Sequence, residues 1–143
     1  MGGTDLIKDE GLRTMATQML GMTEADMNKV TLEMEEELLN AMPVIGSYRL
    51  VAEVVSSKYC FAGCQPGQKL VVDNATQING QESTAPLCVG AIAPLIDRAQ
   101  LLLDRIYHKG DPTAHMSGFR CADPGLDLGG LGSVEFRVRV EKK

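Results

Sequence analysis

The sequence predicts an α+β fold, in which an N-terminal helical hairpin precedes a small β-β-α-β domain with a mainly antiparallel sheet. Three patterns predict it. Apolar residues recur every three or four positions before Pro43, runs rich in β-branched residues begin near Tyr48, and residues 134–140 alternate between apolar and charged. We therefore expect a helical arm over residues 1–43 and a cysteine-containing α+β domain over residues 44–143, together forming one compact unit.

Two helices are expected in the arm. Thr4 caps a first helix that runs to about Leu20, and Gly21 is placed to end it. The segment 23–26 resembles a capping box with Asp in place of Glu, and it opens a second helix that runs to about Met42. Four apolar positions of this second helix are expected to form one buried stripe: Met27, Val30, Met34 and Leu38.

Three strands and one long helix are expected after the arm. Residues 50–55 and 69–73 are predicted to pair as a hairpin, and residues 134–140 to form the closing strand. Residues 87–106 carry the apolar spacing of a long helix. Pro94 either kinks this helix or starts its main part.

Composition and charge argue against two classes of partner. The chain has 143 residues, a formal net charge of −5 and no concentrated basic segment, so nucleic acid is not an expected partner. No apolar run approaches the roughly 20 residues that a membrane-spanning helix needs. The N-terminus also lacks the basic start and apolar stretch of a signal peptide. We expect a cytoplasmic protein without a membrane partner.

Methionine is abundant in this chain, which has eight Met and no Trp. Met-rich packing is adaptable and occurs at partner-binding surfaces. The Met-rich N-terminal helices therefore either pack on their own domain or contact a protein partner or a second copy of the chain. Both alternatives stay open at this point.

The side chains best suited to chemistry are the four cysteines, Cys60, Cys64, Cys88 and Cys121. In a reducing compartment, cysteines are more often metal ligands or reactive thiols than structural disulfides. Three residues separate Cys60 from Cys64, so one turn can aim both sulfurs at a single point. Cys88 falls in the first turn of the expected helix, where the helix dipole favours a thiolate. Cys121 lies in the final loop.

Three interpretations of these cysteines stay open. They hold zinc or an iron–sulfur cluster, since four thiolates suit both. They are unliganded thiols without a cofactor, some of them buried as small apolar residues. They include a redox-active pair, Cys60 with Cys64 or Cys88 with Cys121, although the three-residue spacing differs from the thioredoxin type.

Other candidate residues give weaker signals. His115 is either an extra ligand or proton carrier, or a solvated loop residue. The glycine-rich stretch at 129–132 precedes a strand and not a helix, so it lacks the helix N-terminus that cradles phosphate. No catalytic triad can be assembled from the sequence, and whether the protein is an enzyme stays open.

Three cysteine-bearing segments carry a family resemblance: residues 60–69, Pro86-Leu87-Cys88, and Cys121-Ala122-Asp123-Pro124. Over about residues 48–140 the chain resembles a family of short, functionally uncharacterised prokaryotic proteins. Its members share a cysteine-containing loop between two strands, a Cys at the start of a helix, and a Cys-x-Asp-Pro turn before the last strand. Many carry His where this chain has Cys64, a change that preserves a metal ligand. The resemblance implies a fold and a site but no activity.

Our leading hypothesis is a small cytoplasmic accessory, electron-transfer or assembly protein that binds zinc or an iron–sulfur cluster through Cys60, Cys64, Cys88 and Cys121. The first alternative is a thiol-dependent enzyme with Cys88 as nucleophile, activated by its helix N-terminus. The second is a non-catalytic interaction or dimerisation module in which the cysteines are incidental. The leading hypothesis requires that separate segments of the chain bring the four sulfurs to one place.

Overall fold

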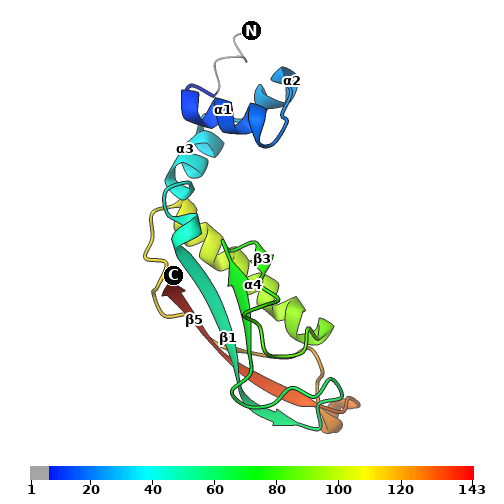
Figure 1. The fold of residues 1–143 in the computed structure, drawn as a ribbon. Helices are drawn as coiled ribbons and strands as arrows, with labels where there is room; N and C mark the ends of the chain where they lie inside the picture. Colours follow the sequence, from blue (N-terminus) through cyan, green and yellow to red (C-terminus); the bar gives the residue numbers. More distant parts are fainter. Residues whose placement is uncertain (1–6) are drawn as a thin grey trace. The chain divides into compact units, whose positions relative to one another are not determined.

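Residues 7–143 are described by the computed structural model, and they form helices and an antiparallel sheet (Figure 1). This confirms the predicted α+β class. The chain divides into two compact units, Met1–Pro43 and Val44–Lys143. The predicted cap Thr4 lies outside the described residues.

The N-terminal unit contains more helices than the predicted hairpin. Its helices are α1 (Glu10–Gln18), α2 (Glu24–Met27) and α3 (Leu32–Ala41). The first predicted helix is shorter than expected, and Gly21 takes a left-handed φ of +66° shortly after it ends. The prediction of one continuous second helix is wrong, because the segment between α2 and α3 breaks it.

Side-chain caps explain where these helices begin. Asp9 caps α1, and Thr23 caps α2 by accepting a hydrogen bond from the N–H of Asp26 at 3.1 Å, as the capping-box pattern predicts. Thr31 is a third cap, which accepts a hydrogen bond from the N–H of Met34 at 3.1 Å. This cap restarts the helix at α3, so the two halves of the predicted helix do not share one apolar stripe.

A small cluster of buried apolar residues holds the N-terminal unit together: Ile7, Leu12, Ala16, Met27 and Val30. Met34, predicted to be buried, is 45% exposed, whereas Glu35 is only 8% exposed. The Glu35 carboxylate accepts hydrogen bonds from the backbone N–H groups of Lys8 and Asp9. A carboxylate can be buried here because backbone donors replace part of its hydration.

The sheet unit has five antiparallel strands in the order β3-β2-β1-β5-β4. They are β1 (Tyr48–Lys58), β2 (Lys69–Asp73), β3 (Gln77–Ile78), β4 (Phe119–Arg120) and β5 (Ser133–Lys142). The predicted β-β-α-β order is incomplete, because β3 and β4 are also present. Two residues are too few to show the alternation by which a strand is recognised in a sequence.

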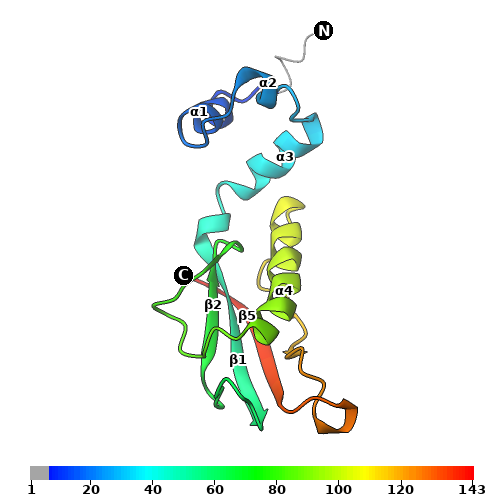
Figure 2. The same ribbon diagram turned by 90° about the vertical axis from the view of Figure 1, so that its right-hand side faces the viewer.

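The two faces of the sheet differ in chemistry. On one face, Leu50, Ala52 and Val54 stand opposite three buried residues of β5, and α4 (Val89–Tyr107) lies along the sheet (Figure 2). On the other face, Arg139 forms an ion pair with Glu53 at 3.1 Å. Val51 stands directly opposite Arg139 and is fully buried, so the aliphatic parts of long charged side chains cover apolar residues on this face.

Helix α4 buries Ala91, Leu95, Leu102 and Ile106 on the apolar face that the spacing predicts. Leu87, predicted on the same face, precedes the helix and is exposed. Its Arg98 donates hydrogen bonds to the carbonyl groups of Ser117 and Gly118, at 3.0 and 2.6 Å, and thereby holds the segment before β4. None of the helices formed by residues 7–143 has the length and apolar character needed to cross a membrane.

A candidate four-cysteine site

All four cysteines line a single cavity of about 90 Å³. They come from three segments: the loop after β1, the start of α4, and the loop before β5. The two loops lie at the same end of the sheet in both views (Figures 1 and 2). A water molecule needs a cavity of only about 10–15 Å³, so this one has room for an ion.

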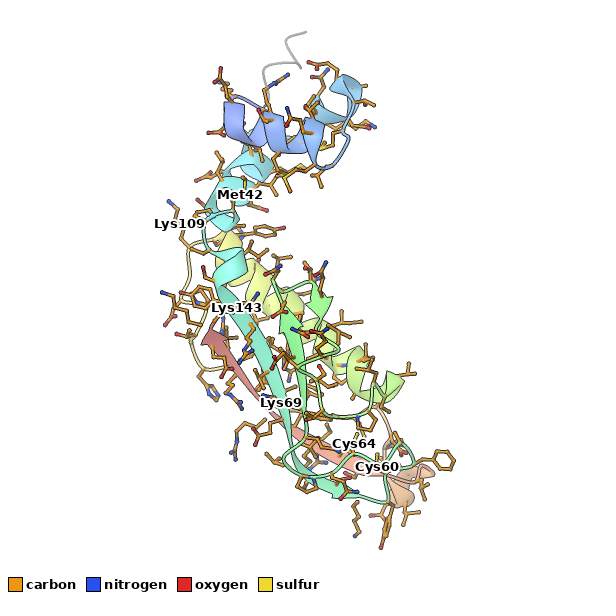
Figure 3. The ribbon with its side chains drawn as sticks, viewed as in Figure 1. Met42, Cys60, Cys64, Lys69, Lys109 and Lys143 are labelled. Atoms are coloured by element: carbon orange, nitrogen blue, oxygen red, sulfur yellow. The ribbon has the colours of Figure 1, made fainter. Side chains whose placement is uncertain are left out.

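The loop after β1 places Cys60 and Cys64 beside each other (Figure 3). The N–H of Gly63 donates to the carbonyl oxygen of Cys60 at 3.2 Å, and the N–H of Cys64 donates to Cys60 Sγ at 3.4 Å. Gly63 has a φ of +85°, a conformation that glycine adopts at low cost. This tight turn therefore directs backbone donors at the Cys60 sulfur.

The thiols of this loop have shifted pKa values. Burial pushes the pKa of Cys60 upward, but hydrogen bonds from the backbone N–H groups of residues 62–64 outweigh it and leave the pKa lower than usual. Burial is also the largest cause at Cys64, and the nearby charges of the other three cysteines add to it. Together they raise the pKa of Cys64 to about 11. The four thiols thus lie close enough to interact electrostatically.

Cys88 is the N-cap residue of α4. Its carbonyl oxygen accepts hydrogen bonds from the N–H groups of Ala91 and Ile92, both at 3.0 Å, but its side chain does not cap the helix. A Cβ added to Gly90 would lie 3.9 Å from Cys88 Sγ and 3.7 Å from the backbone nitrogen of Ala122. Glycine thus leaves space beside the Cys88 sulfur.

Pro94 explains how the Cys121 loop attaches to α4. Proline has no N–H, so Gly90 four residues earlier lacks its usual donor within the helix. The N–H of Ala122 fills this position and donates to the carbonyl oxygen of Gly90 at 2.9 Å. The N–H of Cys121 itself donates to the carbonyl oxygen of Val134 in β5, also at 2.9 Å. Pro94 therefore helps to bring Cys121 toward Cys88 without ending the helix.

Asp123 organises the loop before β5. Its exposed carboxylate accepts hydrogen bonds from the N–H groups of Gly125, Gly132 and Leu131, at distances of 2.9 to 3.0 Å. These bonds hold the pKa of Asp123 below its usual value. A Cβ on Gly130 would lie only 2.2 Å from Asp123 Oδ1, so this position requires glycine. The sequence alone does not single out this role of Asp123.

The chemistry of the cavity is that of soft, electron-rich donors. Among the described residues that line it, Asp123 is the one with a charged side chain, and no Lys, Arg or His contributes. His115 lines a different hollow, beside β4 and β5. Within residues 7–143, no three or more His, Cys, Asp or Glu side chains stand in an arrangement that would hold a metal ion as they are. The described cysteines thus share a cavity without forming a ready-made metal site.

Comparisons of the chain with protein-family models, curated proteins and solved structures find no match. The resemblance to short prokaryotic proteins therefore stays a prediction. Its three segments each contribute at least one cysteine to the cavity.

Proposed function

We propose that this protein binds a thiophilic metal ion or an iron–sulfur cluster through Cys60, Cys64, Cys88 and Cys121, and that it acts as an accessory, electron-transfer or assembly protein. The observation that carries the proposal is the single cavity of about 90 Å³ that all four cysteines line. Four thiolates are the ligand set of structural zinc sites and of common iron–sulfur clusters.

The surroundings of the cysteines favour cation binding over nucleophilic catalysis. A thiolate is activated by a helix N-terminus or by a neighbouring Lys, Arg or His. Cys88 has the helix N-terminus of α4, but none of the described residues lining the cavity supplies a basic side chain to act as its proton acceptor. Ionised thiols in one cavity repel one another, and a bound cation removes that repulsion. The alternative in which Cys88 is a nucleophile therefore receives less support than metal binding.

The loops that carry the cysteines favour metal binding that is coupled to an ordering of these loops. Each cysteine lies in a loop or at a helix end, where small backbone movements cost less than they would inside an element. Metal binding to such a site contributes directly to folding free energy. We expect the loop after β1 and the loop before β5 to become more protected from hydrogen exchange when the metal is added.

The direct test is metal analysis and visible spectroscopy of protein purified without oxygen. An iron–sulfur cluster absorbs visible light through sulfur-to-iron charge transfer, whereas a zinc protein is colourless. We expect about one metal centre per chain, lost in Cys64→Ser and Cys121→Ser but kept in Ser57→Ala, which alters no residue of the cavity. Protein that neither contains zinc or iron nor takes up either metal would overturn the proposal.

The proposal includes a reducing, cytoplasmic setting, because thiols stay available as ligands only where they are kept reduced. Thiol labelling in freshly broken cells tests this point. We expect the labelled cysteines to be in the thiol form or protected by metal, and complete oxidation to disulfides would contradict it.

The N-terminal helices remain a candidate contact surface for a protein partner or a second copy, while nucleic acid and membranes are not proposed partners. Several large apolar side chains of this unit are exposed: Met19, Leu20, Leu32, Met34, Leu39 and Met42. Leu32→Glu should weaken such a contact and leave metal content unchanged, because it lies outside the cysteine site.

A further inference from the structure

Among the strands that the structure describes, none pairs with the outer edge of β5 over its C-terminal half. The N–H of Lys143 donates to the carbonyl oxygen of Ser47, so odd-numbered residues of this strand direct their main-chain groups toward β1. The N–H of Cys121 donates to the carbonyl oxygen of Val134, so even-numbered residues direct theirs to the opposite side. β4 reaches only as far as Phe136, and no described strand pairs with this edge beyond it.

The two edges of the sheet differ in how their main-chain N–H groups are paired. On the outer edge of β2, the N–H groups of Val71 and Lys69 donate to side-chain oxygens of Ser83 and Thr84, at 2.9 and 3.0 Å, and β3 pairs with the rest. The β5 edge has no such cover from the described side chains, and a hollow of about 680 Å³ borders β4 and β5 as far as Val138. The strand continues from there toward the C-terminus (Figure 1). An exposed edge of this kind is a template for another strand.

We propose that a second copy of this chain pairs with this edge, β5 against β5, antiparallel about a two-fold axis at Val140. The outward-facing main-chain groups belong to Val138, Val140 and Lys142. With Val140 on the axis, Val140 faces the partner's Val140, and Val138 faces Lys142 of the partner subunit. These three hydrogen-bonded pairs supply roughly six main-chain hydrogen bonds.

Charge complementarity favours the register with Val140 on the axis, and it favours a second copy of the chain as the strand that pairs with this edge. With Val140 on the axis, Arg139 stands opposite Glu141 of the partner subunit, in a non-hydrogen-bonded pair whose Cα atoms are about 4.5 Å apart. A shift of one residue toward the N-terminus places Arg139 opposite the partner's Arg139, and a shift the other way places Glu141 opposite the partner's Glu141. Only the central register pairs opposite charges at its centre, and the two-fold axis repeats that pair. Within the chain Arg139 already pairs with Glu53 and Glu141, so the contact across the axis would extend an existing row of alternating charges.

Sedimentation equilibrium of the full chain under reducing conditions tests the proposal, which is independent of metal binding. We expect a monomer–dimer equilibrium between micromolar and about millimolar concentration. Val140→Pro removes an N–H that points away from β1, and it should raise the dimer dissociation constant by at least about tenfold. Ile78→Pro is the matched control. It places a proline on the opposite edge, where the N–H also points outward, and should leave dimerisation unchanged.

A charge substitution tests the same contact if Val140→Pro does not fold. Glu141→Arg should weaken the dimer by repulsion from Arg139 across the axis. Glu53→Arg is its control: it also removes an acceptor of Arg139 within the chain, but it lies on β1, away from this edge, and should leave the dimer unchanged. A chain that is monomeric throughout this concentration range would overturn the proposal. So would a dimer that is unaffected by folded Val140→Pro or that is lost in Leu32→Glu, because the contact would then lie elsewhere.

Discussion

Two carboxylates, Glu35 in the N-terminal unit and Asp123 in the sheet unit, perform the same task in different surroundings. Each accepts hydrogen bonds from backbone N–H groups, Glu35 from a distant segment and Asp123 from its own loop. Glu35 is only 8% exposed, in a unit whose apolar cluster is small, whereas Asp123 is exposed beside a sheet with an extensive core. We infer that Glu35 contributes mainly to the stability of its unit, and that Asp123 mainly sets the shape of one loop.

The largest expected effect is that of Glu35→Ala. Removing the carboxylate leaves two partly buried backbone hydrogen bonds unmade, which should lower the free energy of unfolding of the N-terminal unit by about 3 kcal/mol. Hydrogen exchange at Lys8 and Asp9 measures this directly. Glu36→Ala, exposed on the same helix, should change stability by less than about 0.5 kcal/mol. Equal effects of the two variants would show that burial is not what distinguishes Glu35.

Gly130→Ala should have the next largest effect. Its new Cβ would lie 2.2 Å from Asp123 Oδ1 and 2.7 Å from Pro124 Cδ, so the carboxylate must leave at least part of its ring of donors. We expect a loss of about 2 kcal/mol in stability and of protection from exchange at Leu131 and Gly132. The control is Gly129→Ala, where φ is +85° and no atom lies within 4 Å of the new Cβ. It should cost only the roughly 1 kcal/mol of a left-handed alanine.

Both carboxylates mark the limit of what the sequence can predict. Periodicity predicted the α+β class, β1, β2, β5 and α4, because each of these elements buries a regular pattern of apolar residues. It did not predict that Glu35 is buried or that the second helix breaks at Thr31, since a cap and a distant pair of backbone donors decide both. The acidic run around Glu35 matches a solvated helix face equally well.

The cysteine site, too, could be predicted from the sequence only in part. Their residue types and spacing were sufficient to select them as candidates. Whether they meet depends on contacts between distant segments, such as the hydrogen bond from Ala122 to Gly90 and that from Cys121 to Val134. No local pattern encodes these contacts. Pro94 is a partial signal, because a proline inside a helix always leaves one carbonyl group in need of another donor.

Pro94→Ala tests the hydrogen bond between Ala122 and Gly90 without changing any charge at the cavity. The new N–H competes with Ala122 for the carbonyl oxygen of Gly90, so exchange protection at Ala122 should fall several-fold while overall stability changes by less than about 1 kcal/mol. The metal affinity of the proposed site should fall as well. Pro86→Ala, which precedes the helix and frees no helical carbonyl group, serves as the control. Unchanged protection at Ala122 in Pro94→Ala would show that the proline does not maintain this contact.

The smallest expected effect belongs to Asp26, an exposed carboxylate in the same unit as Glu35. A hydrogen bond from Lys29, then one from Thr23, lowers the pKa of Asp26 below its ordinary 3.8. A lowered pKa means that the ionised form stabilises the folded state, so the contribution is complete above about pH 4 and is lost as the pH falls through the folded pKa. An NMR titration should find this pKa lowered in the native chain and closer to 3.8 in Lys29→Ala. Because the side chain is exposed, Asp26→Asn should destabilise the unit far less than Glu35→Ala does. If the two losses were equal, location in the small unit, and not burial of the carboxylate, would determine its energetic contribution.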